Sequence, residues 1–69
     1  MKLSARNVLK GTVKQITDGA VNSEVTLEQS GGATGVAIIT RKSVSSLGLA
    51  VGKDAYAVIK ASSVMVAVD

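Results

Sequence analysis

Residues 20–28 read AVNSEVTLE, and apolar and polar side chains alternate almost strictly along this stretch. Val21, Val25 and Leu27 fall on one face, and polar residues occupy the other face. A period of two is typical of a β-strand that buries one face and exposes the other. We therefore predict a half-buried strand over residues 20–28.

The residues before this stretch predict a second strand, joined to the first by a tight turn. Small or apolar residues share one parity over residues 9–13. Ile16 breaks this parity, which indicates a bulge or bend near Gln15. Asp18-Gly19 lies between the two segments, and this dipeptide is a strong hairpin signal. The two strands should therefore pair in antiparallel fashion.

A third strand and a short helix are predicted next. A Ser30-Gly31-Gly32 turn leads into a strand over residues 34–40. Residues 41–47 have apolar side chains three positions apart, which favours a helix. Thr40 can cap the first turn of this helix, and Gly48 can supply the left-handed conformation that ends it.

Two more strands are predicted after the helix, over residues 55–61 and 63–68. The chain contains no proline to interrupt any of the strands. Three strands, a short helix and two strands follow the order of an OB fold. The fold class is therefore all-β: a five-stranded OB-like Greek-key barrel with one short helix between strands 3 and 4. A chain of 69 residues has room for one domain, residues 1–69.

The last two predicted strands are apolar on both faces. In residues 56–59 and 64–68, apolar side chains occupy both parities. A chain of this size buries only about 60% of its unfolded surface, and without cysteine or histidine it can use neither disulfides nor a zinc site. We therefore expect a homo-oligomer that buries the outer face. The alternative is simple exposure, since over half of an ordinary protein surface is apolar.

Composition excludes several functional classes. With no histidine or cysteine, and with five scattered acids, the chain lacks the usual groups for acid–base, thiolate or cation chemistry. We predict that it is not an enzyme and binds no free metal cation.

No apolar run approaches the roughly 20 residues that span a bilayer, and no signal-peptide core follows the N-terminus, so a cytoplasmic protein is expected. The net charge of +3 favours anionic partners.

Two segments carry hydrogen-bond donors without any carboxylate. They are Ser4-Ala5-Arg6-Asn7 and Lys60-Ala61-Ser62-Ser63. A fully deprotonated tetrahedral oxyanion offers only acceptor oxygens, so its site needs hydroxyl, backbone N–H and cationic donors that converge. A solvated arginine and turn-forming serines are the ordinary alternative for such segments.

Three motifs resemble the molbindins, the Mop or molybdenum-pterin-binding family. They are Ser4-Ala5-Arg6-Asn7, Gly19-Ala20-Val21-Asn22 and Lys60-Ala61-Ser62-Ser63-Val64-Met65, and the similarity extends over essentially the whole chain. The resemblance implies an OB-like barrel that assembles as a hexamer, a trimer of dimers, with oxyanions bound at subunit interfaces. It also implies a role in intracellular molybdenum storage or homeostasis through binding of molybdate or tungstate, with no catalytic cofactor.

The same resemblance assigns two groups of oxyanion-binding residues. The first group consists of Ser4, Ala5, Arg6, Lys60, Ala61 and Ser62. The second group consists of Gly19, Ala20, Val21 and Asn22, with Thr40 and Ser43 added to it.

Two other functions fit parts of the sequence. An OB-type module that binds single-stranded nucleic acid would match the basic charge, but such modules stack bases on aromatic side chains and Tyr56 is the only aromatic residue. The same shortage argues against a pterin ligand and favours the bare oxyanion. A structural oligomerisation module would explain the doubly apolar strands, but it would not explain the acid-free donor segments.

Overall fold

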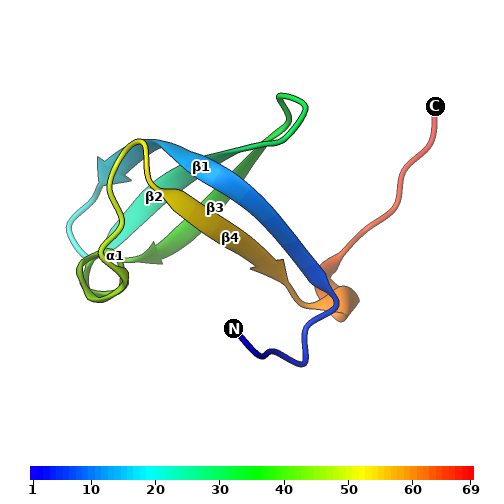
Figure 1. Cartoon of the computed structure of the whole chain (residues 1–69), viewed down its shortest axis with the longest axis horizontal. Helices are drawn as coiled ribbons and strands as arrows, with labels where there is room; N and C mark the ends of the chain where they lie inside the picture. The colour runs from blue at the N-terminus through cyan, green and yellow to red at the C-terminus, as the bar shows by residue number, and fades with distance from the viewer.

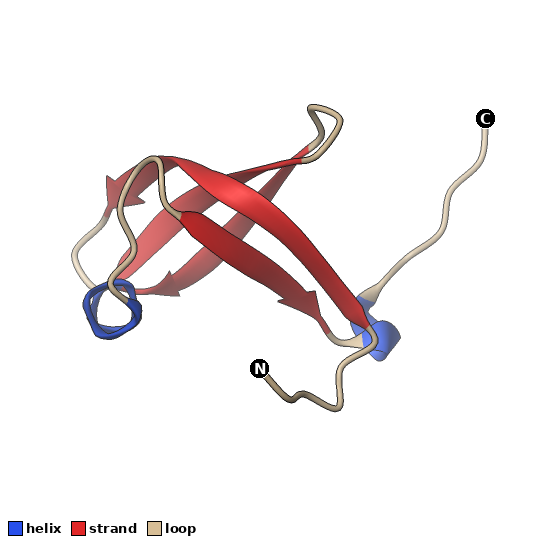
Figure 2. Ribbon diagram, in the orientation of Figure 1, coloured by secondary structure: helices blue, strands red, loops and turns tan.

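The computed structural model describes all 69 residues as one antiparallel sheet with two short helices. The sheet has the strand order β3-β2-β1-β4 and curves into a half-barrel (Figure 1). Strands dominate, and the helical segments are short (Figure 2). No helix of the chain has the length and apolar character to cross a membrane. The elements are β1 (Asn7–Asp18), β2 (Asn22–Gln29), β3 (Thr34–Thr40), α1 (Arg41–Leu47), β4 (Asp54–Ile59) and the 3-10 helix η1 (Ala61–Ser63).

Strand β1 joins the two halves of the sheet. Its first half pairs with β4, from Asn7 opposite Ile59 to Thr12 opposite Asp54. Its second half pairs with β2, and the register shifts between Val13 and Gln15. The bulge predicted near Gln15 is thus confirmed. A bulge bends its strand and increases the local twist, so β1 can serve both halves of the curved sheet.

The core is small and lies beneath β1 and β2. Val13, Val25 and Leu27 are its buried members, and parts of β3, β4, α1 and the following loop pack against them. The alternation predicted for β2 is confirmed at Val25 and Leu27. The prediction is wrong for Val21, which is 70% exposed and precedes the strand. The Gly19 N–H donates to the Asn22 carbonyl at 2.7 Å, and this bond closes a turn that includes Val21.

The predicted helix is confirmed in its position and in both caps. The Thr40 hydroxyl accepts a hydrogen bond from the Ser43 N–H at 3.0 Å. Gly48 adopts a φ of 65°, and its N–H donates to the Ser45 carbonyl at 3.1 Å. These bonds satisfy backbone groups that a helix end otherwise leaves without partners.

The chain forms four strands, so the prediction of five strands is not met within one chain. Strand β4 ends at Ile59, residues 61–63 form η1, and residues 64–69 run away from the sheet without pairing (Figure 1). A strand requires a hydrogen-bonding neighbour, and this segment, which we call the tail, reaches none in its own chain. Val66 and Val68 in the tail are therefore 91% and 93% exposed.

Gly11 should be essential for the close approach of the paired strands β1 and β2. A Cβ atom at Gly11 would lie 2.8 Å from the Glu28 carbonyl oxygen, closer than real Cβ atoms come. Gly11→Ala should therefore destabilise the fold by about 1–3 kcal/mol, because the strands must move apart. Gly35→Ala is the matched control, since its Cβ would meet only the Gln29 side chain at an ordinary 3.5 Å. Urea unfolding, monitored by circular dichroism, measures the free energy of unfolding of both variants. Equal stability of the two variants would contradict this role of Gly11.

Candidate functional site

The first predicted group of residues meets at one end of the β1–β4 pair. Asn7 pairs with Ile59, so the residues just before Asn7 and just after Ile59 emerge together at this end (Figure 1). The Asn7 side-chain amide also donates to the Ile59 carbonyl at 3.4 Å. The pairing thereby brings residues 4–6 and 60–62 from opposite ends of the sequence to one end of the sheet.

This first group is rich in donors and open to solvent. The Ser63 N–H donates to the Lys60 carbonyl at 2.9 Å, which closes the 3-10 turn. The first N–H groups of a helical turn have no acceptor inside it, so those of Ala61 and Ser62 can donate to a ligand. Every residue of the group is exposed except Ala5, which is half-buried. One chain therefore provides the donors but does not enclose them.

The second predicted group also comes together, at the other end of β1. Asn22 pairs with Thr40, and the Arg41 N–H donates to the Val21 carbonyl at 2.9 Å. These bonds hold the turn at residues 19–22 against the start of α1. The Thr40 hydroxyl donates to the Ser43 hydroxyl at 2.8 Å. These two side chains are therefore already engaged in capping the helix. The two groups lie at opposite ends of β1 and cannot form one pocket within a chain.

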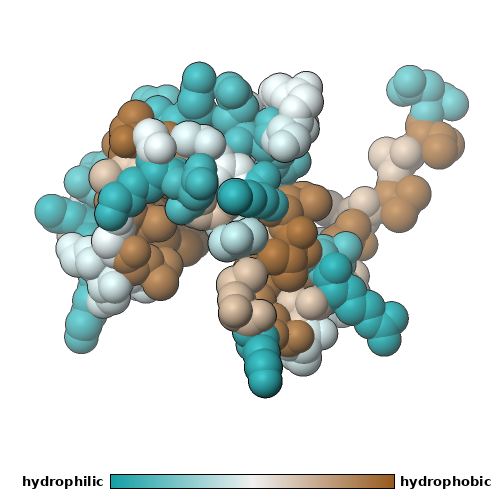
Figure 3. Space-filling model, in the orientation of Figure 1, coloured by the Kyte–Doolittle hydropathy of each residue, from teal (hydrophilic) through white to brown (hydrophobic).

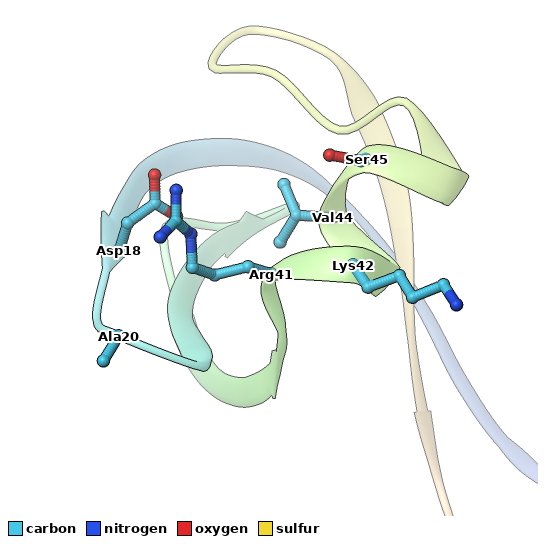
Figure 4. A pocket seen from close by; sticks show the side chains of 6 residues that line it. All are labelled: Asp18, Ala20, Arg41, Lys42, Val44 and Ser45. Atoms are coloured by element: carbon cyan, nitrogen blue, oxygen red, sulfur yellow. The ribbon is translucent and has the colours of Figure 1, made fainter.

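A pocket of about 350 Å³ lies beside the second group (Figure 4). It shares only Ala20 with that group. The side chains of Asp18 and Arg41 are drawn in the same part of this pocket, whereas Lys42 extends away from them (Figure 4). The lining residues are Asp18, Ala20, Arg41, Lys42, Val44 and Ser45.

Sequence reasoning missed Asp18, Arg41, Lys42 and Ser45 as pocket residues. The sequence predicts a turn at Asp18 and places the other three in a short helix. Nothing in their spacing indicates a shared site, because the hairpin and the pairing of β2 with β3 bring them together. A second hollow of about 480 Å³ lies near Lys10 and the Gly31-Gly32 turn. Both of its carboxylates are engaged in ion pairs, Asp54 with Lys10 at 3.8 Å and Glu28 with Lys14 at 3.3 Å.

Solved structures with the same fold include molybdate-binding proteins. MopII from Clostridium pasteurianum superposes with a TM-score of 0.92 at 42% identity, covering 97% of this chain and 100% of MopII. The cytoplasmic molybdate-binding protein ModG, solved with molybdate bound, gives a TM-score of 0.85 at 54% identity. This match covers 88% of the present chain and 43% of the ModG chain.

Sequence comparison gives the same relationship. The family model of the TOBE domain matches residues 3–66. A protein of Haemophilus influenzae named "Probable molybdenum-pterin-binding protein" is 49% identical over the full length of both chains. The family-model match, the shared fold and the end-to-end sequence match agree with one another, and the chain belongs to the molybdenum-pterin-binding family of TOBE-domain proteins.

Proposed function

We propose that this chain binds molybdate or tungstate and serves intracellular molybdenum storage or homeostasis without catalysing a reaction. The observation that carries the proposal is the convergence of the acid-free segments at residues 4–6 and 60–62. The relatives support the choice of anion, since MopII and ModG share the fold and ModG is a cytoplasmic molybdate-binding protein. A binding role rather than catalysis is supported by relatives that are named as molybdenum-pterin-binding or molybdate-binding proteins.

Binding would exchange the hydration shell of the dianion for protein donors. The hydroxyls of Ser4 and Ser62 and the N–H groups of the 3-10 turn would donate to the anion oxygens. Arg6 and Lys60 would offset the charge. Hydrogen bonds to a charged group contribute about 1.5–3 kcal/mol each, so about four of them reach the roughly 8 kcal/mol of a micromolar complex.

The exposed surface supports assembly of the chain into an oligomer. The chain exposes 5420 Å², whereas about 4000 Å² is expected for a folded monomer of 7.0 kDa. The excess is roughly 1400 Å², and a stable interface buries about 800 Å² on each partner. Apolar surface remains visible on the hollowed side beneath the sheet and along the tail (Figure 3).

The tail offers a specific way to close the barrel. Strands β3 and β4 are the two free edges of the sheet, and an OB barrel needs a fifth strand between them. We propose that the tail of a second copy adds there as that strand, with its apolar faces covered by both subunits. Because the tail follows directly after residues 60–62, this exchange would also cover the first donor group and make it an interface site.

Further apolar surface supports an assembly larger than a dimer. Val36 and Ile38 on β3 are 61% and 62% exposed. They alternate with the half-buried Ala37 and Ile39, which face the core side. Strand exchange alone would therefore leave Val36 and Ile38 uncovered. A hexamer built as a trimer of dimers would bury them in a second kind of contact. The group at residues 19–22, Thr40 and Ser43 would then form a second oxyanion site between subunits.

Molybdate binding should depend on Arg6 and Ser62. Arg6→Ala should weaken binding by about tenfold or more, and Ser62→Ala by a smaller factor, because each removes one donor to a charged ligand. Isothermal titration calorimetry with molybdate, sulfate and phosphate measures this. Lys53→Ala is the matched control: Lys53 lies just before β4, and its backbone hydrogen bonds to Val13 and Ala50 do not need the side chain. The proposal fails if molybdate gives no heat, or if sulfate binds equally well.

The assembly should depend on the tail. Val66→Asp puts a charge on a segment that would be buried between subunits, so the particle should fall toward the 7.0 kDa monomer and lose molybdate affinity. Ser30→Asp adds the same charge in the exposed turn before β3 and should leave the assembly intact. Light scattering coupled to size-exclusion chromatography gives both masses. A monomeric wild-type protein, or an unchanged mass for Val66→Asp, would refute strand exchange.

Affinity for molybdate should be almost independent of pH around neutrality. The first group contains no histidine or cysteine, and no other side chain ordinarily changes charge between about pH 6 and 8. Equilibrium dialysis across this range should give dissociation constants that agree within about twofold. A tenfold change per pH unit centred near 6.5 would mean that a different site binds the anion.

A further inference from the structure

The dipeptide Asp18-Gly19 is a place where the backbone of this chain can rearrange chemically. The amide nitrogen of the residue after an aspartate can attack the side-chain carboxyl carbon of that aspartate. Glycine has no side chain to hinder this attack, whereas Asp54 is followed by Ala55, whose Cβ atom does hinder it. Asp18 and Gly19 are both exposed, so water reaches them.

The rearrangement needs only water as a co-reactant. A bond forms between the Gly19 nitrogen and the side-chain carboxyl carbon of Asp18, and the hydroxyl of the protonated carboxyl group leaves with the amide proton as water. Water then opens the five-membered succinimide ring. When the bond from the nitrogen to the main-chain carbonyl carbon breaks, the product is isoaspartate, and its backbone is one carbon atom longer.

The folded turn engages both reacting groups in other bonds. The Gly19 N–H donates to the Asn22 carbonyl at 2.7 Å, so this nitrogen already has a partner. The Ser23 hydroxyl donates to Asp18 Oδ1 at 2.6 Å, and the two residues are opposite one another in the β1–β2 pairing. The attack on Asp18 therefore requires that the turn first open.

Ser23 occupies a position that the rest of β2 gives to apolar side chains. The buried residues of β2 are Ser23, Val25 and Leu27, and Ser23 is 1% exposed. The hydrogen bond to Asp18 satisfies its hydroxyl. A buried hydroxyl without a partner costs free energy, so opening of the turn is unfavourable for Ser23 as well as for Asp18.

We propose that Asp18-Gly19 is an isoaspartate-forming modification site that the fold keeps closed, with Ser23 as the positioning residue that holds Asp18 away from the reaction. The modification proceeds from the open turn, so its rate follows the local opening equilibrium. The additional backbone carbon would separate the Gly19 N–H from the Asn22 carbonyl. It would thereby disrupt the turn at residues 19–22.

Ageing of the protein at neutral pH, followed by peptide mapping with mass spectrometry, measures isoaspartate at residue 18. Folded wild-type protein should form it at least about tenfold more slowly than the same chain unfolded in urea, the factor that corresponds to one hydrogen bond to a charged group. Asp54-Ala55 is the internal control and should form much less isoaspartate in urea. Gly19→Ala should reduce the rate at residue 18 in urea for the same steric reason.

Two variants separate the role of Ser23 from a general loss of stability. Ser23→Ala should raise the rate in the folded protein by about tenfold, because Asp18 loses its hydrogen-bond donor. Val25→Ala is the matched control: it removes a buried side chain from the same face of β2 but leaves both turn bonds in place. It should isomerise at the wild-type rate at a temperature where circular dichroism shows both variants folded.

Three results would overturn the inference. They are equal rates in folded and unfolded wild-type protein, no isoaspartate at residue 18 in the unfolded chain, and equal rates in folded Ser23→Ala and Val25→Ala. The first two need wild-type protein only, so they decide the matter even if Ser23→Ala does not fold. The reaction requires no ligand, and its outcome is therefore independent of molybdate binding.

Discussion

The double pairing of β1 is the constraint on which the rest of the structure depends. One twelve-residue strand must pair with β4 through its first half and with β2 through its second half. The register shift after Val13 supplies the bend, and the missing side chain of Gly11 lets the β2 backbone approach. Because both donor groups are attached to the ends of β1, this bend also determines where each one lies.

The open edges of the sheet are the reason why we propose that the anion binds between subunits. Only five of the 69 residues are buried, and the chain exposes more surface than a compact monomer of its size would. The most exposed large hydrophobic side chains lie in the tail, directly after the 3-10 turn that carries the donors. Assembly and formation of the anion site would therefore be one event, and a ligand that binds the assembled form would stabilise it by mass action.

The two ends of β1 differ in their chemistry. The first donor group is free of acids, which suits an anion with no proton to give. The pocket at the other end is lined by Asp18, which accepts a hydrogen bond from the buried Ser23 hydroxyl, and by Arg41.

The sequence by itself determined the local elements. The alternation at Val25 and Leu27, the break in parity at Ile16 and the caps at Thr40 and Gly48 are short-range signals, and the structure agrees with each. Tertiary structure alone decided which distant residues meet. The convergence of residues 4–6 with residues 60–62 was expected only from resemblance, and the pocket that Asp18 and Arg41 line was not expected at all. The tail was predicted as a strand from its apolar pattern, but a strand also needs a partner edge, and that depends on the assembled fold rather than on the segment's own sequence.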